Sequence, residues 1–192
     1  MHAPHVPRSQ RLQSDASSNV LVYLTGHGGD GFLKFADHEE MSSVDLADAI
    51  HTAHSQRRYN ELLFVADTCQ ASTLAAALRS PGVVALSSSS LGEPSWSAQP
   101  DGGVGLTLID RFTRAAFAFL ESRLPSAGST ATLAQLVESL ETAGLGSTPV
   151  VRGDLFTRAP SAVRLADFFA ASPPRAEATA AAYPGPSVDD AS

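Results

Sequence analysis

The sequence predicts an α/β protein with a mainly parallel sheet, and three observations support this fold class. Apolar runs without polar alternation stand at residues 19–24 and 62–66, a pattern typical of strands covered on both faces. A third run, rich in Val and Ala, follows a Pro-Gly turn at 82–87. Segments with helical spacing separate the runs, so strands and helices alternate. A chain of 192 residues, 43% hydrophobic and 17% charged, is expected to form one domain with a sizeable core.

The amino-terminal half contains the clearest elements. Residues 1–18 are polar and are interpreted as a linker. Ser42-Ser43 offers a helix N-cap, and an apolar stripe with helical spacing then continues to about Gln56. The other expected elements are a strand at 19–24, a short extended or hairpin piece at 32–35, a strand at 61–68, an alanine-rich helix at 71–78 and a strand at 82–87.

The carboxyl-terminal half begins with a long loop at 91–105, rich in Gly and Pro, and loops of this length inside a compact domain are usually functional. Amphipathic helices are expected at 106–122 and 130–142. Short apolar groups between 148 and 169 indicate a final strand with docking turns. The Ala- and Pro-rich tail, 172–192, is expected to be disordered.

Charge and composition exclude several classes of function. The net charge is −7 and the pI is near 5.2, and no cluster of Lys and Arg favours nucleic acid or an anionic membrane. The single cysteine excludes an internal disulfide and a Cys-rich zinc site, and the histidines lack metal-ligand spacing, so neither metal nor cofactor is expected. Residues 1–18 lack a signal-peptide core, and no transmembrane run occurs. Taken literally the chain is soluble and cytosolic, although a fragment of a longer gene would look the same.

The only cysteine, Cys69, follows one apolar run, and His27 follows another. Because the carboxyl ends of parallel strands meet at one rim of a sheet, where such sheets bind ligands, we expect these side chains to lie close together. A thiol attacks a carbonyl as the thiolate, which a nearby imidazole favours. Cys69 is also expected at a helix amino terminus, whose dipole favours a negative sulfur. A lone cysteine after a strand is more often inert and buried, but the residues around His27 favour a Cys/His enzyme.

Four glycines surround His27 between residues 26 and 31. So many residues without a Cβ imply either tight turns or the close approach of a substrate backbone. The segment lacks the ending of a phosphate-binding loop, so acyl transfer is the preferred chemistry, with the amide groups of Gly28 and Cys69 as the candidate oxyanion hole. Asp67 could orient an imidazole, but a bond to local backbone is the more common role for such a carboxylate.

A run of four serines closes the third expected strand, and Glu93 follows it. Such a run is most often a solvated strand end. If the rim holds an active site, these side chains would instead line the substrate cleft, and the candidates are Ser87, Ser88, Ser89 and Glu93.

Three segments together resemble a known family: NVLVYLTGHGGDGFLKF at 19–35, RRYNELLF at 57–64 and DTCQA at 67–71. They are similar to the catalytic subunits of glycosylphosphatidylinositol (GPI) transamidases, which are relatives of legumain. Legumain-type peptidases share the His-Gly and Cys positions but not RRYNELLF or GFLKF. The resemblance extends from about Pro7 to Phe169.

The resemblance implies a caspase-like α/β/α sandwich over residues 19–171, with His27 and Cys69 as the catalytic dyad. It implies that Cys69 attacks a proprotein at its attachment site, releases the hydrophobic carboxyl-terminal signal peptide and forms a thioester. The ethanolamine amine of a GPI lipid would then resolve this thioester. Family members act at the lumenal side of the endoplasmic reticulum membrane, in a complex with other transamidase subunits.

The family pattern also has parts that this chain does not contain. In the family, the first strands, an asparagine that assists the histidine, a metal-binding region and a cysteine linked to a partner subunit all lie upstream, so we interpret this catalytic domain as partial and truncated at its amino terminus. Expressed alone, it is expected to be poorly soluble or oligomeric and inactive, because its first strand would present an open edge. Two alternatives stay open: a legumain-like cysteine endopeptidase, in which water resolves the thioester, and an inactive fragment that serves only as a binding module.

Overall fold

The structure is a computed structural model that describes residues 7, 12–35, 39–99 and 109–169. A four-stranded sheet, in the order β1-β5-β6-β7, forms its middle layer. The strands are β1 (Asn19–Thr25), β5 (Glu61–Asp67), β6 (Val83–Ser87) and β7 (Val150–Arg152). Strands β1, β5 and β6 are parallel and β7 is antiparallel, so the sheet is mainly parallel as predicted.

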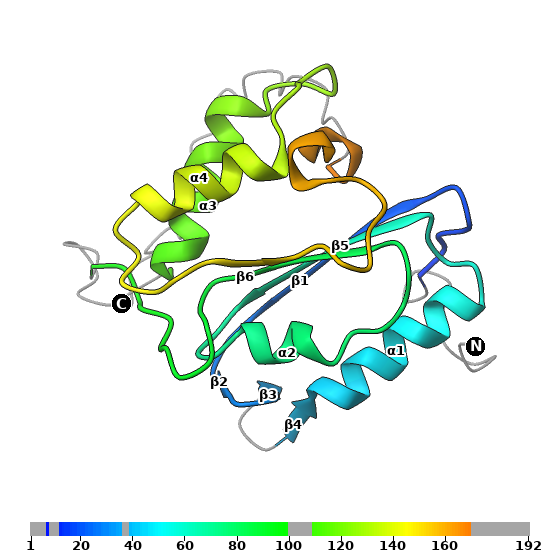
Figure 1. The fold of residues 1–192 in the computed structure, drawn as a ribbon, viewed down its shortest axis with the longest axis horizontal. Coiled ribbons are helices and arrows are strands. Elements are labelled where there is room, and N and C mark those ends of the chain that lie inside the picture. The colour runs from blue at the N-terminus through cyan, green and yellow to red at the C-terminus, as the bar shows by residue number, and fades with distance from the viewer. Residues whose placement is uncertain (1–6, 8–11, 36–38, 100–108, 170–192) are drawn as a thin grey trace, which may run out of the picture.

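Helices cover both faces of this sheet (Figure 1). Helices α1 (Ser43–Ser55) and α2 (Ser72–Ala76) lie on one face, and α3 (Arg111–Arg123) and α4 (Leu133–Thr142) lie on the other. Successive side chains of a strand point to opposite faces, so β5 contributes Leu62 and Phe64 to one core and Leu63 and Val65 to the other. Burial on both faces explains the apolar runs without alternation, and the arrangement confirms the predicted α/β/α sandwich.

The two parallel strands that carry the candidate dyad differ in burial. Every residue of β5 from Leu62 to Asp67 is buried, and the same is true of β6. Strand β1 is only half-buried, and the Tyr23 side chain is 39% exposed. The sequence predicted that β1 is covered on both faces. In the described part of the chain it forms an edge of the sheet, which leaves its side chains less covered.

A small antiparallel sheet stands beside the main one and consists of β2 (Gly28–Gly29), β3 (Phe32–Phe35) and β4 (Glu39–Ser42). The predicted extended piece at 32–35 is its central strand, while β4 was not expected. Helix α1 starts directly after β4, because Ser42 Oγ accepts a hydrogen bond from the Asp45 amide at 3.1 Å while the Asp45 carboxylate accepts from the Ser42 amide at 3.3 Å. This capping box confirms the predicted N-cap.

Three helices differ from their predicted bounds. Helix α4 begins at Leu133 rather than at residue 130, after an N-cap at Thr132. The helix expected at 106–122 begins at Arg111, because Asp110 is extended and bridges Ser97, and residues 106–108 lie outside the described ones. The helix expected at 71–78 is only Ser72–Ala76 long, and Arg152 Nη1 donates to carbonyl groups at its end. Within the described residues, no helix combines the length and the apolar character that crossing a bilayer needs.

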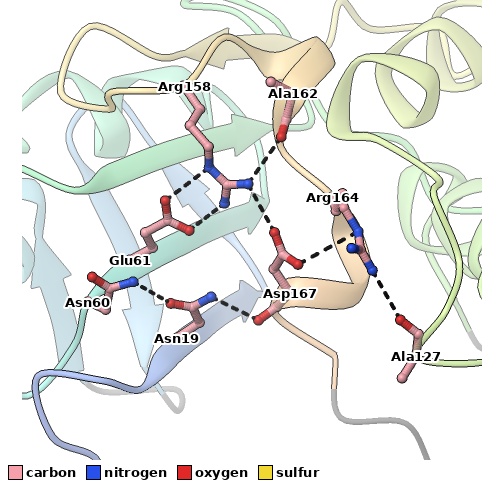
Figure 2. Close-up of polar contacts among 8 residues, drawn as sticks. All are labelled: Asn19, Asn60, Glu61, Ala127, Arg158, Ala162, Arg164 and Asp167. Atoms are coloured by element: carbon pink, nitrogen blue, oxygen red, sulfur yellow. Dashed lines mark hydrogen bonds and ion pairs between the residues drawn. The ribbon is translucent and has the colours of Figure 1, made fainter.

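The segment from Arg158 to Asp167 docks beside Asn19 and Glu61, at the amino ends of β1 and β5 (Figure 2). Cys69 lies beyond the other end of β5. The Arg158 guanidinium pairs with both Glu61 and Asp167, and it also donates to the carbonyl of Ala162 at 3.1 Å. The Asn19 side chain donates to the Asp167 carbonyl at 3.1 Å. These contacts hold the two short 3-10 helices, Pro160–Ala162 and Leu165–Asp167, against the sheet.

We expect Arg158→Met to lower the free energy of unfolding by about 2 kcal/mol, between the values for exposed and fully buried ion pairs. The side chains of Arg158 and Glu61 are only 30% and 16% exposed, so removing the guanidinium leaves a half-buried carboxylate without a cation. The matched control is Arg79→Met, whose pair with Asp48 is 49% and 59% exposed and should change stability by less than about 0.5 kcal/mol. Urea unfolding of both variants measures the difference, and equal midpoints would contradict the prediction.

Candidate active site

The candidate dyad, His27 and Cys69, lies just beyond the carboxyl ends of β1 and β5. The sequence predicted that these two strands end at the same rim of the sheet. The parallel register places Thr25 opposite Asp67, and His27 and Cys69 each stand two residues beyond this pair. The Gly26 amide donates to the Asp67 carbonyl at 3.3 Å, which ties the bases of the two loops together. The His27 side chain is exposed and Cys69 is half-buried, so both are accessible to a large substrate.

The two loops also pack directly on each other at Gly28. A Cβ at this position would lie 2.5 Å from Thr68 Oγ1 and 2.7 Å from the Phe32 carbonyl oxygen, both far too close. Only glycine therefore lets the histidine loop approach the residue before Cys69. The turn offered as one explanation for the glycines applies at Gly31, where φ is +76°. At Gly28 the close neighbours are this chain's own Thr68 and Phe32, so the approach of a substrate backbone stays a prediction.

The Cys69 loop is fixed by the segment that follows β6. Four neighbouring backbone amides are engaged: Thr68 N donates to Ser88 Oγ, Gln70 N to Glu93 O, Ala71 N to Ser89 Oγ and Ser72 N to Ser89 O, at 3.2, 2.8, 3.1 and 3.0 Å. The Cys69 amide has no such partner within the described residues. The φ of Gln70 is +54°, a left-handed conformation that a non-glycine residue adopts only when its surroundings enforce it. The loop thus leaves one donor free beside the thiol.

The orientation of the Gly28 amide follows from the ladder between β2 and β3. Lys34 N donates to His27 O at 2.8 Å, so these two residues form a hydrogen-bonded pair. Hydrogen-bonded pairs alternate with non-hydrogen-bonded pairs along an antiparallel ladder. The next pair, Gly28 and Leu33, is therefore a non-hydrogen-bonded one. The Gly28 N–H therefore points away from β3. The amides of Gly28 and Cys69 remain the candidate oxyanion hole.

The serines that close β6 have a different environment from the one expected. Ser87, Ser88 and Ser89 are at most 1% exposed, so they are neither a solvated strand end nor the lining of an open cleft. The hydroxyl groups of Ser88 and Ser89 contact the backbone of the Cys69 loop, which includes a 2.8 Å bond from Ser89 Oγ to Thr68 O. Ser88 and Ser89 are thus buried residues that support the Cys69 loop.

Glu93 also has a supporting role, because its side chain joins the loop after β6 to the segment around Thr148. Its carboxylate accepts hydrogen bonds from the Thr148 amide at 2.8 Å, from the Ser90 amide at 3.0 Å and from the Thr148 hydroxyl at 2.9 Å. These bonds, the Thr148 amide first, hold the pKa of Glu93 below its usual value. The side chain joins segments 55 residues apart in the sequence.

Asp67 is fully buried at the end of β5, two residues before Cys69. Its carboxylate accepts hydrogen bonds from Ser95 Oγ at 2.7 Å, from Thr113 Oγ1 at 2.6 Å and from the Thr113 amide at 3.2 Å. Both carboxylate oxygens are thus engaged by the loop after β6 and by α3. These contacts make Asp67 an anchor of the rim, and within the described residues neither oxygen accepts a hydrogen bond from the His27 imidazole.

Asp110, the N-cap of α3, is a charged neighbour of the site that was not among the residues expected there. Burial raises the pKa of this carboxyl above its usual value, and the negative charge of Asp67 adds to the effect. A hydrogen bond from Ser97 Oγ and the charge of His27 act in the opposite direction. Asp110 is therefore an electrostatic neighbour of both His27 and Asp67. The sequence gives no signal for it, because Asp110 falls inside the helix expected at 106–122.

The helix-dipole argument for Cys69 was wrong. Helix α2 has only five residues and starts at Ser72, three positions after the cysteine. So short a helix has a weak dipole, and its first amides are already bound by Ser89. Any activation of the thiol must come from side chains at the rim.

Comparison with known proteins identifies the family of this chain. Residues 5–142 match the family model of the peptidase C13 family. The chain belongs to the peptidase C13 family. The GPI-anchor transamidase of Homo sapiens is 47% identical over 166 residues, which make up 86% of this chain and 42% of that protein. The Schizosaccharomyces pombe protein of the same name is 46% identical over 165 residues, 86% of this chain and 43% of the relative.

These relatives confirm the resemblance seen in the sequence, and the chain spans less than half of their length. Among solved structures, caspase-1 from Spodoptera frugiperda superimposes with a TM-score of 0.52 at 18% identity, covering 78% of this chain and 65% of that one. This likeness confirms the caspase-like fold of the C13 domain. In the described residues, no group of three or more His, Cys, Asp or Glu side chains is arranged to hold a metal ion.

Proposed function

We propose that this C13 chain carries the catalytic dyad of a GPI-anchor transamidase, with Cys69 as nucleophile and His27 as acid and base. The observation that carries the proposal is the shared rim, where the β1 and β5 loops pack on each other at Gly28 and Thr68. The identity of 46–47% to GPI-anchor transamidases over most of this chain supports the choice of reaction. The acyl donor is a proprotein with a hydrophobic carboxyl-terminal signal, and the acceptor is the ethanolamine amine of a GPI lipid.

The first half of the reaction cleaves the peptide bond at the attachment site. His27 takes the proton of the Cys69 thiol, and the thiolate attacks the carbonyl carbon to form the C–S bond. The amides of Gly28 and Cys69 donate to the developing oxyanion. As the C–N bond breaks, the His27 imidazolium gives its proton to the leaving amine. The products are a thioester on Cys69 and the released signal peptide.

The second half transfers the acyl group to the lipid. The acceptor amine attacks the thioester carbonyl and gives a proton to His27 while the C–S bond breaks. That proton returns to the sulfur, which restores the thiol and leaves an amide between protein and lipid. The exposed setting of His27 suits an acceptor that must enter from a membrane surface. The working enzyme is a complex with other transamidase subunits at the lumenal side of the endoplasmic reticulum membrane.

The test identifies which nucleophile resolves the thioester. Membranes from cells whose anchor attachment depends on this protein are incubated with a signal-bearing peptide and a small primary amine, and mass spectrometry identifies the new carboxyl-terminal group. The expected product is the amide of the added amine. A free carboxylate alone would overturn the transamidase and favour a legumain-like endopeptidase. An uncleaved peptide would overturn both enzymes in favour of a binding module.

A further inference from the structure

One hydroxyl group links the histidine loop to the cysteine loop. Thr73 Oγ1, on the first turn of α2, accepts a hydrogen bond from the Gly31 amide at 2.8 Å. The same oxygen lies 2.8 Å from the Gln70 carbonyl and 3.3 Å from the Gly29 carbonyl. A hydroxyl has a single proton, and the shorter distance favours donation to Gln70. Thr73 therefore contacts both loops at once.

Gly31, whose amide Thr73 binds, lies in the turn between β2 and β3, the hairpin that follows His27. Gly31 has a φ of +76°, and its carbonyl accepts from the Ser43 amide at 2.7 Å at the start of α1. The amide and the carbonyl of this one residue are thus bound by two different helices. A turn fixed on both sides positions the short β2 and β3 strands, and with them the imidazole that precedes them.

The other end of the link is the strained residue after the nucleophile. Gln70 has a φ of +54°, its amide donates to Glu93 O, and its side-chain oxygen accepts from the Gly92 amide. Its carbonyl is the group that Thr73 engages, through both the hydroxyl and the Thr73 amide at 3.0 Å. Thr73 thus supports the backbone conformation that directs Cys69 toward the rim.

We infer that Thr73 is a positioning residue that sets the relation between the His27 imidazole and the Cys69 thiol. The inference rests on the proposed Cys/His dyad and adds a residue to its support. Among the described residues, two other contacts join the loops: the bond from the Gly26 amide to the Asp67 carbonyl, and the packing of Gly28 on the Thr68 side chain. Both lie close to the carboxyl ends of β1 and β5. The Thr73 hydroxyl instead binds the turn at Gly31, which joins β2 to β3.

The test uses the pH dependence of alkylation by iodoacetamide on the full 192-residue chain. Cys69 is the only cysteine, so every alkylation event is read at this site. The measured quantity is the ratio of the rate at pH 6 to the rate at pH 9. An ordinary thiol has a pKa of about 8.5, so it is mostly ionised at pH 9 and almost wholly protonated at pH 6. The ratio therefore reports activation by a base, while changes in access to the thiol cancel.

Thr73→Val keeps the shape of the side chain and removes the hydroxyl. We expect it to lower the ratio about tenfold, because a displaced base loses much of its effect. Thr73→Ser keeps the hydroxyl and should stay within about twofold to threefold of the unmodified chain. The matched control is Thr142→Val in α4, whose hydroxyl bonds only to carbonyls of its own helix at Glu138 and Ser139 and should leave the ratio unchanged.

Circular dichroism checks that each variant is folded, and the chain in concentrated urea gives the ratio of an unactivated thiol. If Thr73→Val does not fold, Thr73→Ala is compared with Thr73→Ser, since these differ only by the hydroxyl. A ratio for Thr73→Val equal to that of the unmodified chain would overturn the positioning role while leaving the dyad intact. If the unmodified chain already gave the urea ratio, His27 would not activate Cys69 in this chain and the positioning role would be overturned. The proposed function is decided separately, by the amide product formed in the membranes.

Discussion

Replacing Cys69 with alanine is expected to abolish formation of the amide product, with a loss of at least about 10³-fold in rate. The reaction has no covalent intermediate without the sulfur, and no second cysteine can replace it. The substitution removes one half-buried atom from a loop that the backbone contacts of Ser88, Ser89 and Glu93 hold in place, so folding should persist.

The measurement is the yield of amide from the signal-bearing peptide, together with surface display of a GPI-anchored reporter in cells that depend on the variant. His27→Ala should show the same loss. Residues that act as one unit are not additive, so the double variant should be no worse than either single one. Normal display with Cys69→Ala would exclude the cysteine as nucleophile, and additive losses would mean that the two residues act separately.

The second large effect is expected at Gly28, where alanine should lower the rate of acyl transfer by about 10²-fold to 10³-fold. A Cβ there collides with Thr68 Oγ1 at 2.5 Å and with the Phe32 carbonyl at 2.7 Å. A side-chain hydroxyl can rotate, but the carbonyl belongs to β3 and can shift only with the hairpin. The collision therefore moves the Gly28 amide away from the oxyanion it is placed to bind, and a shift of about 1 Å is enough for a loss of this size.

A matched control separates this local effect from a general cost of adding a methyl group. Gly153 has no atom within 4 Å of a Cβ built on it, so Gly153→Ala should leave activity unchanged. Gly28→Ala should also lower the free energy of unfolding by about 1–3 kcal/mol, the usual cost of overpacking, which thermal unfolding measures. Activity within threefold of the unmodified protein would mean that the hairpin accommodates the methyl group and that the Gly28 amide does not bind the oxyanion.

The residue patterns alone predicted an α/β fold with a mainly parallel sheet, because apolar runs without alternation and helices with one apolar stripe are local patterns. The caspase-like sandwich was implied by the family resemblance. The residue patterns also predicted the N-cap at Ser42, where hydroxyl and carboxyl groups stand three residues apart. The placement of His27 and Cys69 at one rim followed from the rule that parallel strands end together. The register of β1 on β5 agrees with it, each residue being two positions beyond the paired strand ends. Their catalytic roles stay a prediction.

Only the tertiary structure decided what surrounds these two residues. The serines after β6 looked like a solvated strand end or a cleft lining, and they are buried supports of the Cys69 loop because β6 lies inside the sheet. Glu93 binds Thr148 across 55 residues, and the Thr73 hydroxyl meets Gly31 across 42. No local pattern encodes such pairs, since each partner satisfies ordinary rules for a loop or a helix start. The strands, and the positions of the Cys69 thiol and the His27 imidazole after them, could be predicted from local sequence. The contacts that hold these two groups in place form only when distant segments pack together.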